Sequence, residues 1–320
     1  MSIQAQILNS ILRKFVKSER QKQKEYSYTD ARKLMNQPGY EDQNTNFVSK
    51  FLAKKIFGKK QSNINIEEIY LDNIRTLKFS SSSFTTNKCI LYFHGGGYIA
   101  GSPETHQNFL THLCKISEIP IYAIDYSLAP EHPYPAALND AVSSYQSILK
   151  IGHNPENIFL GGDSAGGNLT LVCALKLQKL NQKLPSKLFL LSPWTDLTAS
   201  GESVKFNAEK DPYLSYDNFL TTGESSKTAV QEWYAPGQDY SDPMISPVFA
   251  DYESFPETLI QVSDIEILLS DAINLKEKLK QNKNSVSLKI YKNVPHVWQV
   301  FGFLPEAKEA TFEISNFLNS

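Results

Sequence analysis

The chain has 320 residues and a formal net charge of −2, with 41% hydrophobic and 21% charged residues. This length and composition suit a globular chain with a sizeable core, which excludes global disorder and low-complexity architectures. The near-neutral charge also argues against a nucleic-acid partner. Three cysteines are too few for a disulfide framework or a zinc site, and their odd number fits a reducing cytosol.

The first 60 residues differ in charge from the rest of the chain. They hold 10 Lys and 3 Arg against 5 acidic residues, a net charge of +8 that leaves −10 for the remainder. Apolar residues recur there at helical spacing in two stripes, which are Ile7, Leu8, Ile11, Leu12, Phe15 and Val16, then Phe47, Phe51, Leu52 and Ile56. We expect residues 1–60 to form a helical cap segment docked on the main domain. A helix on a membrane surface is the alternative.

From residue 61 onward, the pattern predicts alternating strands and helices. The expected strands lie at 64–70, 74–79, 89–93, 120–125, 157–161, 187–191, 258–262 and 286–291. The expected helices lie near 105–116, 136–150, 165–181, 269–279 and 306–318. Such alternation predicts an α/β catalytic domain over 61–320, with a mostly parallel sheet covered by helices on both faces. The irregular stretch at 198–250 interrupts this order, and we expect a second cap segment at about 198–240.

The sequence GGDSAGG begins at Gly161, where an apolar strand runs into glycines and a helix. Its Gly162-x-Ser164-x-Gly166 pattern is typical of a nucleophile elbow, a strand-to-helix turn too tight for side chains at the two glycine positions. The turn places a serine hydroxyl at a helix N-terminus, where a developing anion is stabilised. Ser164 is therefore the candidate nucleophile.

A second glycine-rich loop, HGGGY at 94–98, directly follows the expected strand at 89–93. Consecutive glycines let backbone amides approach a substrate closely, as donors to the oxyanion of acyl transfer must. Lipases and esterases combine such a loop with the amide that follows the nucleophile. We expect the donors to be the amides of Gly95, Gly96 and Ala165, and Gly97 is a further candidate.

A serine nucleophile needs a base and an acid. Six histidines are present, and His296 alone follows a late strand on a loop, which fits the chain order serine, acid, histidine. Asp264, Glu266 and Asp271 all follow the strand at 258–262, and the residues alone leave the choice among them open.

Together these motifs resemble the hormone-sensitive-lipase-like carboxylesterases. The resemblance covers about residues 70–317 and rests on HGGGY, GDSAGG, DYSLAPEHPYPAA at 125–137, SPWTDLT at 192–198 and DPMISP at 242–247. It implies the α/β-hydrolase fold. It also implies that Glu266 is the acid, with Asp264 the alternative. Two departures are Ser127, where the family usually has Arg, and His-Val-Trp at 296–298, where it often has His-Gly-Phe.

The resemblance implies a serine esterase that hydrolyses carboxylic esters, with acyl chains of short to medium length, through an acyl-enzyme intermediate. We expect a small-molecule ester as substrate, no metal and no organic cofactor, and a cytoplasmic protein without a transmembrane segment. A homodimer is left open. The alternatives are an amidase or peptidase with the same triad, and a catalytically inactive small-molecule receptor of the same fold. The presence of His296 argues against the receptor.

Overall fold

The structure, a computed structural model, describes residues 1–22, 28–29, 32, 63–214 and 230–320. The described strands form one sheet in the order β1-β2-β4-β3-β5-β6-β7-β8. β2 pairs antiparallel with β1 and β4, and every other neighbouring pair is parallel. The strands are β1 (Asn65–Leu71), β2 (Ile74–Ser80), β3 (Cys89–Phe93), β4 (Ile121–Ile124), β5 (Ile158–Asp163), β6 (Lys187–Leu191), β7 (Glu257–Ser263) and β8 (Val286–Tyr291).

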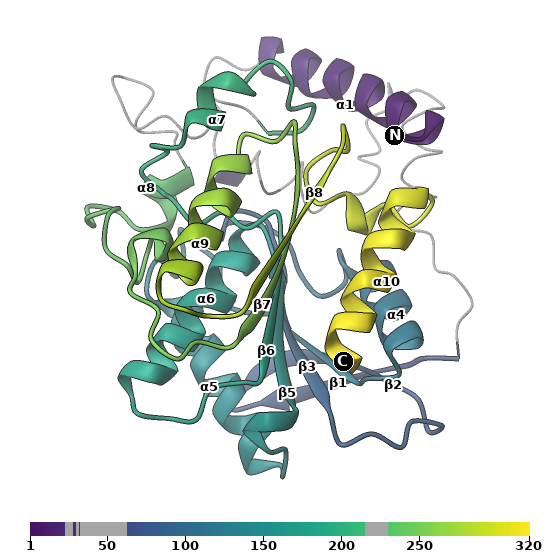
Figure 1. The fold of residues 1–320 in the computed structure, drawn as a ribbon, viewed down its shortest axis with the longest axis vertical. Coiled ribbons are helices and arrows are strands. Elements are labelled where there is room, and N and C mark those ends of the chain that lie inside the picture. Colours follow the sequence, from purple (N-terminus) through teal and green to yellow (C-terminus); the bar gives the residue numbers. More distant parts are fainter. Residues whose placement is uncertain (23–27, 30–31, 33–62, 215–229) are drawn as a thin grey trace.

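Helices cover both faces of this sheet (Figure 1). Helices α5 (Ala136–Lys150), α6 (Ala165–Lys179) and α9 (Leu269–Gln281) lie on one face, and α4 (Gln107–Ser117) and α10 (Pro305–Asn319) lie together on the other. The remaining described helices are α1 (Ile3–Lys22), α7 (Glu202–Phe206) and α8 (Val230–Tyr234), with 3-10 turns at Pro155–Asn157, Pro247–Phe249 and Trp298–Val300. The expected α/β architecture is thereby confirmed.

The alternation of side chains along the central strands divides the core into two layers. In β3, Cys89, Leu91 and Phe93 pack into the apolar cluster under α5 and α6, whereas Ile90 and Tyr92 pack into the cluster under α4 and α10. This period of two follows from strand geometry, and a strand buried on both faces must be apolar throughout. The uninterrupted apolar run in the sequence is therefore explained by cover on both sides.

The three cysteines are buried free thiols. Burial raises the pKa of Cys89 and Cys114 to about 12, so neither is a thiolate near neutral pH. Within the described ranges, no helix combines the length and the apolarity needed to cross a membrane.

Helix α1 packs against the C-terminal part of the chain. Ala5 and Leu8 belong to a separate apolar cluster with Val294, Trp298, Leu304 and residues of α10. Asn9 Nδ2 donates to the Asn293 carbonyl oxygen at 2.8 Å, and the Arg13 guanidinium donates to the Lys210 carbonyl oxygen at 2.9 Å. Helix α1 thus contacts both the 293–304 segment and the segment that follows α7.

The first apolar stripe is confirmed as a helix, but it does not face inward along its whole length. Leu8 is 1% exposed, while its neighbour Ile7 is 56% exposed. The second stripe, Phe47 to Ile56, lies outside the described residues. The expected irregular stretch at 198–250 contains the short helices α7 and α8, and residues 215–229 within it lie outside the description.

Leu8→Ala is expected to lower the free energy of unfolding by about 2–4 kcal/mol, because it removes a buried side chain and leaves a cavity beside Trp298. Ile7→Ala is the matched control on the same helix. Its side chain is largely exposed, so we expect a change within about 0.5 kcal/mol. Urea unfolding of both variants measures the difference, and equal effects would show that α1 does not pack as described.

Candidate active site

The residues singled out from the sequence converge at one edge of the sheet. β3, β5, β6, β7 and β8 run parallel, so their carboxyl ends meet at the same edge. The glycine loop follows β3, Ser164 follows β5, Glu266 follows β7 and His296 follows β8. In an open parallel sheet this edge is where ligands bind.

Ser164 lies on a strained turn between β5 and α6. Its backbone has φ 53° and ψ −120°, a conformation that non-glycine residues rarely adopt. A Cβ atom on Gly162 would lie 2.3 Å from the Gly166 carbonyl oxygen, and one on Gly166 would lie 2.0 Å from the Phe93 carbonyl oxygen. Both flanking positions therefore require glycine, for the steric reason inferred from the sequence.

Glu266 and His296 form a close buried pair. His296 Nδ1 lies 2.6 Å from Glu266 Oε2. The other carboxylate oxygen, Oε1, accepts from the Ser263 amide and from Ser192 Oγ, each at 2.8 Å. Glu266 is fully buried and His296 is 5% exposed. The carboxylate is thus held in one orientation toward the imidazole.

The other two acidic candidates lie elsewhere and bind backbone amides. Asp264 Oδ1 accepts from the Asn293 amide at 2.7 Å, which joins the loops after β7 and β8. Asp271 Oδ2 accepts from the amides of Thr195 and Asp196 at 2.7 and 2.9 Å. Of the three acids that the residues left open, the structure brings Glu266 alone to the His296 ring.

The charges around His296 favour its protonated form. Burial by itself would lower the pKa of the imidazole, but Glu266 and, to a smaller extent, Asp211 and Asp163 raise it overall. The side chains of Ser164 and His296 do not form a hydrogen bond with each other. Such contacts are often long without substrate and tighten when it binds.

The glycine loop is fixed by the carboxylate next to the nucleophile. The Gly95 amide donates to Asp163 Oδ1 at 2.9 Å, and a Cβ atom on Gly95 would lie 2.2 Å from Asp163 Oδ2. The amide of Gly95, which the sequence suggested as an oxyanion donor, is therefore already bound to Asp163. The amides of Gly96, Gly97 and Ala165 donate to no described residue, and positive φ angles of 124° and 62° at Gly96 and Gly97 turn the loop.

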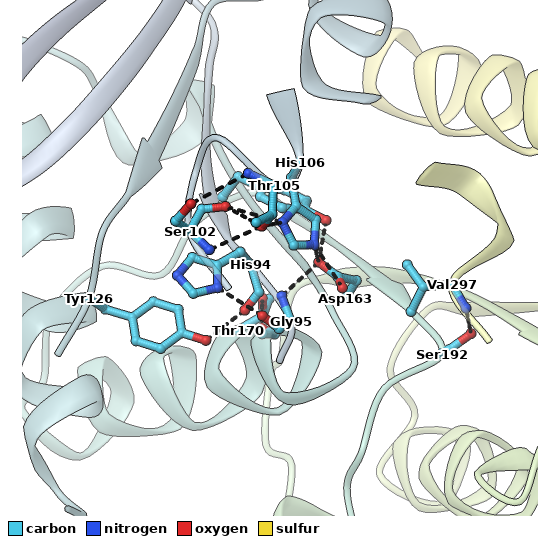
Figure 2. A network of polar contacts seen from close by, with 12 residues as sticks. His94, Gly95, Ser102, Thr105, His106, Tyr126, Asp163, Thr170, Ser192 and Val297 are labelled. Carbon is cyan, nitrogen blue, oxygen red and sulfur yellow. Dashed lines mark hydrogen bonds and ion pairs between the residues drawn. The ribbon is translucent and has the colours of Figure 1, made fainter. Parts of the chain in front are cut away.

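Asp163 is the centre of the polar network in Figure 2. Besides the Gly95 amide, it accepts from Tyr92 Oη at 2.7 Å and contacts His106 Nε2 at 3.2 Å. Burial alone would raise the pKa of Asp163, but the charge and hydrogen bond of His106 lower it overall. Burial alone would lower the pKa of His106, but the charge and hydrogen bond of Asp163 raise it overall, so each group favours the charged form of the other.

The pKa of His94 is shifted in the opposite direction to that of His106. Its ring stacks on Tyr126 at 4.2 Å between centroids, and Tyr126 Oη donates to the His94 carbonyl oxygen at 2.7 Å. Burial and the nearby His106 lower the pKa of His94 to about 4. His94 is therefore neutral near pH 7, and its ring lies between those of Tyr126 and His106 (Figure 2).

Sequence reasoning missed Ser192, although its position after β6 resembles the positions of the other site residues. Ser192 Oγ donates to Glu266 Oε1 and accepts from the Val297 amide at 3.4 Å. Val297 itself has φ 49°, a strained conformation for a β-branched residue. Glycine in the family's His-Gly-Phe avoids that strain, so the departure at this position has a local cost.

The described residues contain no group of three or more His, Cys, Asp or Glu side chains suited to hold a metal ion.

A family model for the α/β-hydrolase fold matches residues 90–300. An esterase from Acinetobacter venetianus is 35% identical over 258 residues, which cover 80% of this chain and 82% of the relative. An acetyl-hydrolase from Streptomyces hygroscopicus is 32% identical and covers 73% of this chain and 76% of its own. The crystal structure of an esterase from the bacterial hormone-sensitive lipase family matches with a TM-score of 0.85 and 30% identity, covering 99% of this chain and 98% of the other.

Proposed function

Because the chain belongs to the hormone-sensitive-lipase-like carboxylesterases of the α/β-hydrolase family and is a carboxylic ester hydrolase, we propose that Ser164, Glu266 and His296 are its catalytic triad. The observation that carries this proposal is the 2.6 Å contact between Glu266 and His296 at the sheet edge that holds the strained Ser164 turn. The family relationship establishes ester hydrolysis, and the proposal adds which three residues catalyse it.

In the proposed mechanism, His296 removes the proton of Ser164 as the hydroxyl attacks the ester carbonyl carbon. Glu266 fixes the imidazole tautomer and stabilises the imidazolium that forms. His296 then protonates the leaving alcohol, and the acyl group stays on Ser164 as an ester. Water, activated by His296, hydrolyses this acyl-enzyme and regenerates the serine. Apart from the ester and water, the steps use only Ser164, His296, Glu266 and backbone amides of the chain.

The oxyanion donors in this proposal are the amides of Gly96, Gly97 and Ala165. Gly95 is replaced by Gly97 in the proposed set because the Gly95 amide binds Asp163. Ala165 is the first residue of α6, so its amide has no partner within the helix and lies beside the nucleophile. The helix dipole adds to the stabilisation of the oxyanion.

Gly95→Ala is expected to reduce kcat by about 10²–10³-fold, since a Cβ atom would clash with Asp163 and displace the donors on this loop. The matched control is Gly302→Ala, because a Cβ atom there meets no atom within 4 Å. We expect that control to retain the activity of the native enzyme. Steady-state kinetics of both variants decide the matter, and native turnover in Gly95→Ala would contradict the role of the loop.

Two segments of the chain are proposed to form a cap over the site. We propose that residues 1–60 and about 198–240 cover the site and restrict it to acyl chains of short to medium length. Support comes from Tyr213, whose ring lies 6.0 Å from that of His296 between centroids and is 36% exposed. In this proposal, Tyr213 of the second cap segment forms part of the wall of the site beside His296.

Hydrolysis of p-nitrophenyl esters from C2 to C16, measured beside an amide of the same acyl group, tests the proposed specificity. We expect the largest kcat/KM between C2 and about C8 and at least about 10²-fold less activity on the amide. A maximum at C14–C16 would contradict the chain-length proposal. Equal activity on the amide would favour an amidase, and absence of turnover on every substrate would favour a binding protein.

A further inference from the structure

A buried carboxylate that the proposed triad does not use lies beside the Glu266–His296 pair. Asp211 is 6% exposed and belongs to the segment that follows α7. Its Oδ2 accepts from the Ile267 amide at 3.0 Å, and Ile267 is the residue next to Glu266. Asp211 therefore holds the loop that carries the proposed acid.

Two neutral side chains, Ser203 on α7 and Asn207 directly after it, hold that loop as well. Asn207 Nδ2 donates to the carbonyl oxygens of Glu266 at 2.8 Å and Asp264 at 3.0 Å. Ser203 Oγ donates to the Ile267 carbonyl oxygen at 2.5 Å. Among these three anchors, Asp211 alone can carry a negative charge.

Asp211 also orients the residue that covers His296. Its Oδ1 accepts from the amides of Tyr213 and Leu214, each at 2.9 Å. The Tyr213 ring lies nearly parallel to the His296 ring, with an angle of 27° between their planes. One carboxylate thus joins the acid loop on one side to the aromatic cover of the base on the other.

We propose that Asp211 is a positioning residue of the esterase reaction, which fixes the Glu266 loop and the Tyr213 ring around His296 and adds a second negative charge that stabilises the imidazolium. This inference rests on the proposed triad. It also gives the second cap segment a direct part in turnover, because that segment supplies Asp211.

The charged groups around Asp211 determine the expected pH dependence. Glu266 and His296 interact with it from the acid loop and the 293–297 loop, and the Tyr213 phenol lies on its own segment. Burial and the charge of Glu266 raise the pKa of Asp211 to about 6. At pH 7, Asp211 is therefore mostly ionised. Its charge raises the pKa of His296, whose protonated form cannot act as the base.

The pH profile of kcat/KM for Asp211→Asn tests this proposal. Asparagine keeps the volume and an oxygen for the Tyr213 and Leu214 amides, but it carries no charge and its NH₂ group cannot accept from the Ile267 amide. Loss of the charge lowers the pKa of His296, so we expect the acid limb to move to lower pH by about one unit. We also expect kcat to fall on the order of tenfold, because the imidazolium is less stabilised.

Asn207→Ala is the matched control, since it removes a neutral anchor of the same loop. We expect it to lower kcat without moving the acid limb. Asp251→Asn, which neutralises an exposed carboxylate outside both cap segments, should leave both quantities unchanged. Asp211→Ser provides a second neutral variant that retains an acceptor for the nearby amides.

An acid limb that stays at the native pH in Asp211→Asn and Asp211→Ser would overturn the proposal, even if kcat falls. That result would mean that Asp211 acts only through packing and not through its charge. Failure of the triad gives a different result. If Ser164→Ala remained active, the proposed function would fail whatever the pH profile of the Asp211 variants.

Discussion

Ser164→Ala is expected to reduce ester hydrolysis by at least about 10⁴-fold while the protein stays folded. The hydroxyl is the group that would form the acyl-enzyme, and the oxyanion donors cannot replace it as a nucleophile. Because Ser164 lies on a turn with φ 53°, alanine has the same backbone cost as serine, so stability should change little. Steady-state turnover of a p-nitrophenyl ester and a thermal melting curve measure the two quantities.

The matched control for this variant is Ser82→Ala, which changes an exposed serine far from the sheet edge. It should retain native kcat and native Tm. Near-native hydrolysis by a folded Ser164→Ala protein would contradict the proposed nucleophile, and with it the mechanism as a whole.

Glu266→Gln is expected to lower kcat by about 10⁴-fold, the size of the loss when the corresponding aspartate of a serine protease becomes an amide. Glutamine keeps the volume but loses the charge that stabilises the imidazolium. Its NH₂ group can also stand where a carboxylate oxygen now accepts the proton of His296 Nδ1 at 2.6 Å, which favours the wrong tautomer. Steady-state kcat and a melting curve separate this effect from a loss of folding.

Asp264→Asn is the matched control on the same loop. Its oxygen can still accept from the Asn293 amide, so we expect turnover within a few-fold of native and a stability change of about 1 kcal/mol or less. A loss of several orders of magnitude in Asp264→Asn, with native turnover in Glu266→Gln, would exchange the proposed roles of the two residues.

The order of strands and helices was predictable because it follows from residue patterns within short stretches of the sequence. The continuous apolar run at 89–93 and the glycines around Ser164 depend on burial and steric demands that act within a few residues. The chain order of serine, acid and histidine then placed His296 at the correct edge of the sheet. These features needed no knowledge of contacts between distant segments.

The sequence did not distinguish which amides of the glycine loop are the proposed oxyanion donors. The amides of three consecutive glycines cannot be told apart by sequence. The Gly95 amide differs from the others because it binds Asp163, which lies 68 residues away along the chain. The same reason applies to Ser192 and Asp211. Both residues act through partners that are distant in sequence, at Glu266 and Ile267.

The exposed face of Ile7 has a related explanation. Helical periodicity identifies an apolar stripe but does not define how much of it a neighbour covers. The surface formed by Val294, Trp298 and Leu304 is wide enough for Ala5 and Leu8, and Ile7 lies beyond it. The width of that surface depends on the C-terminal segment.

The most direct test of the central claim is intact-mass analysis after treatment with a phenylmethylsulfonyl reagent, followed by peptide mapping. The proposed mechanism predicts one adduct per chain, on Ser164, with loss of hydrolysis in proportion to labelling. His296→Ala should label far more slowly, because a serine hydroxyl is a poor nucleophile without its base. An adduct on another residue, or labelling of the His296→Ala protein at the native rate, would contradict the assignment of Ser164 and His296.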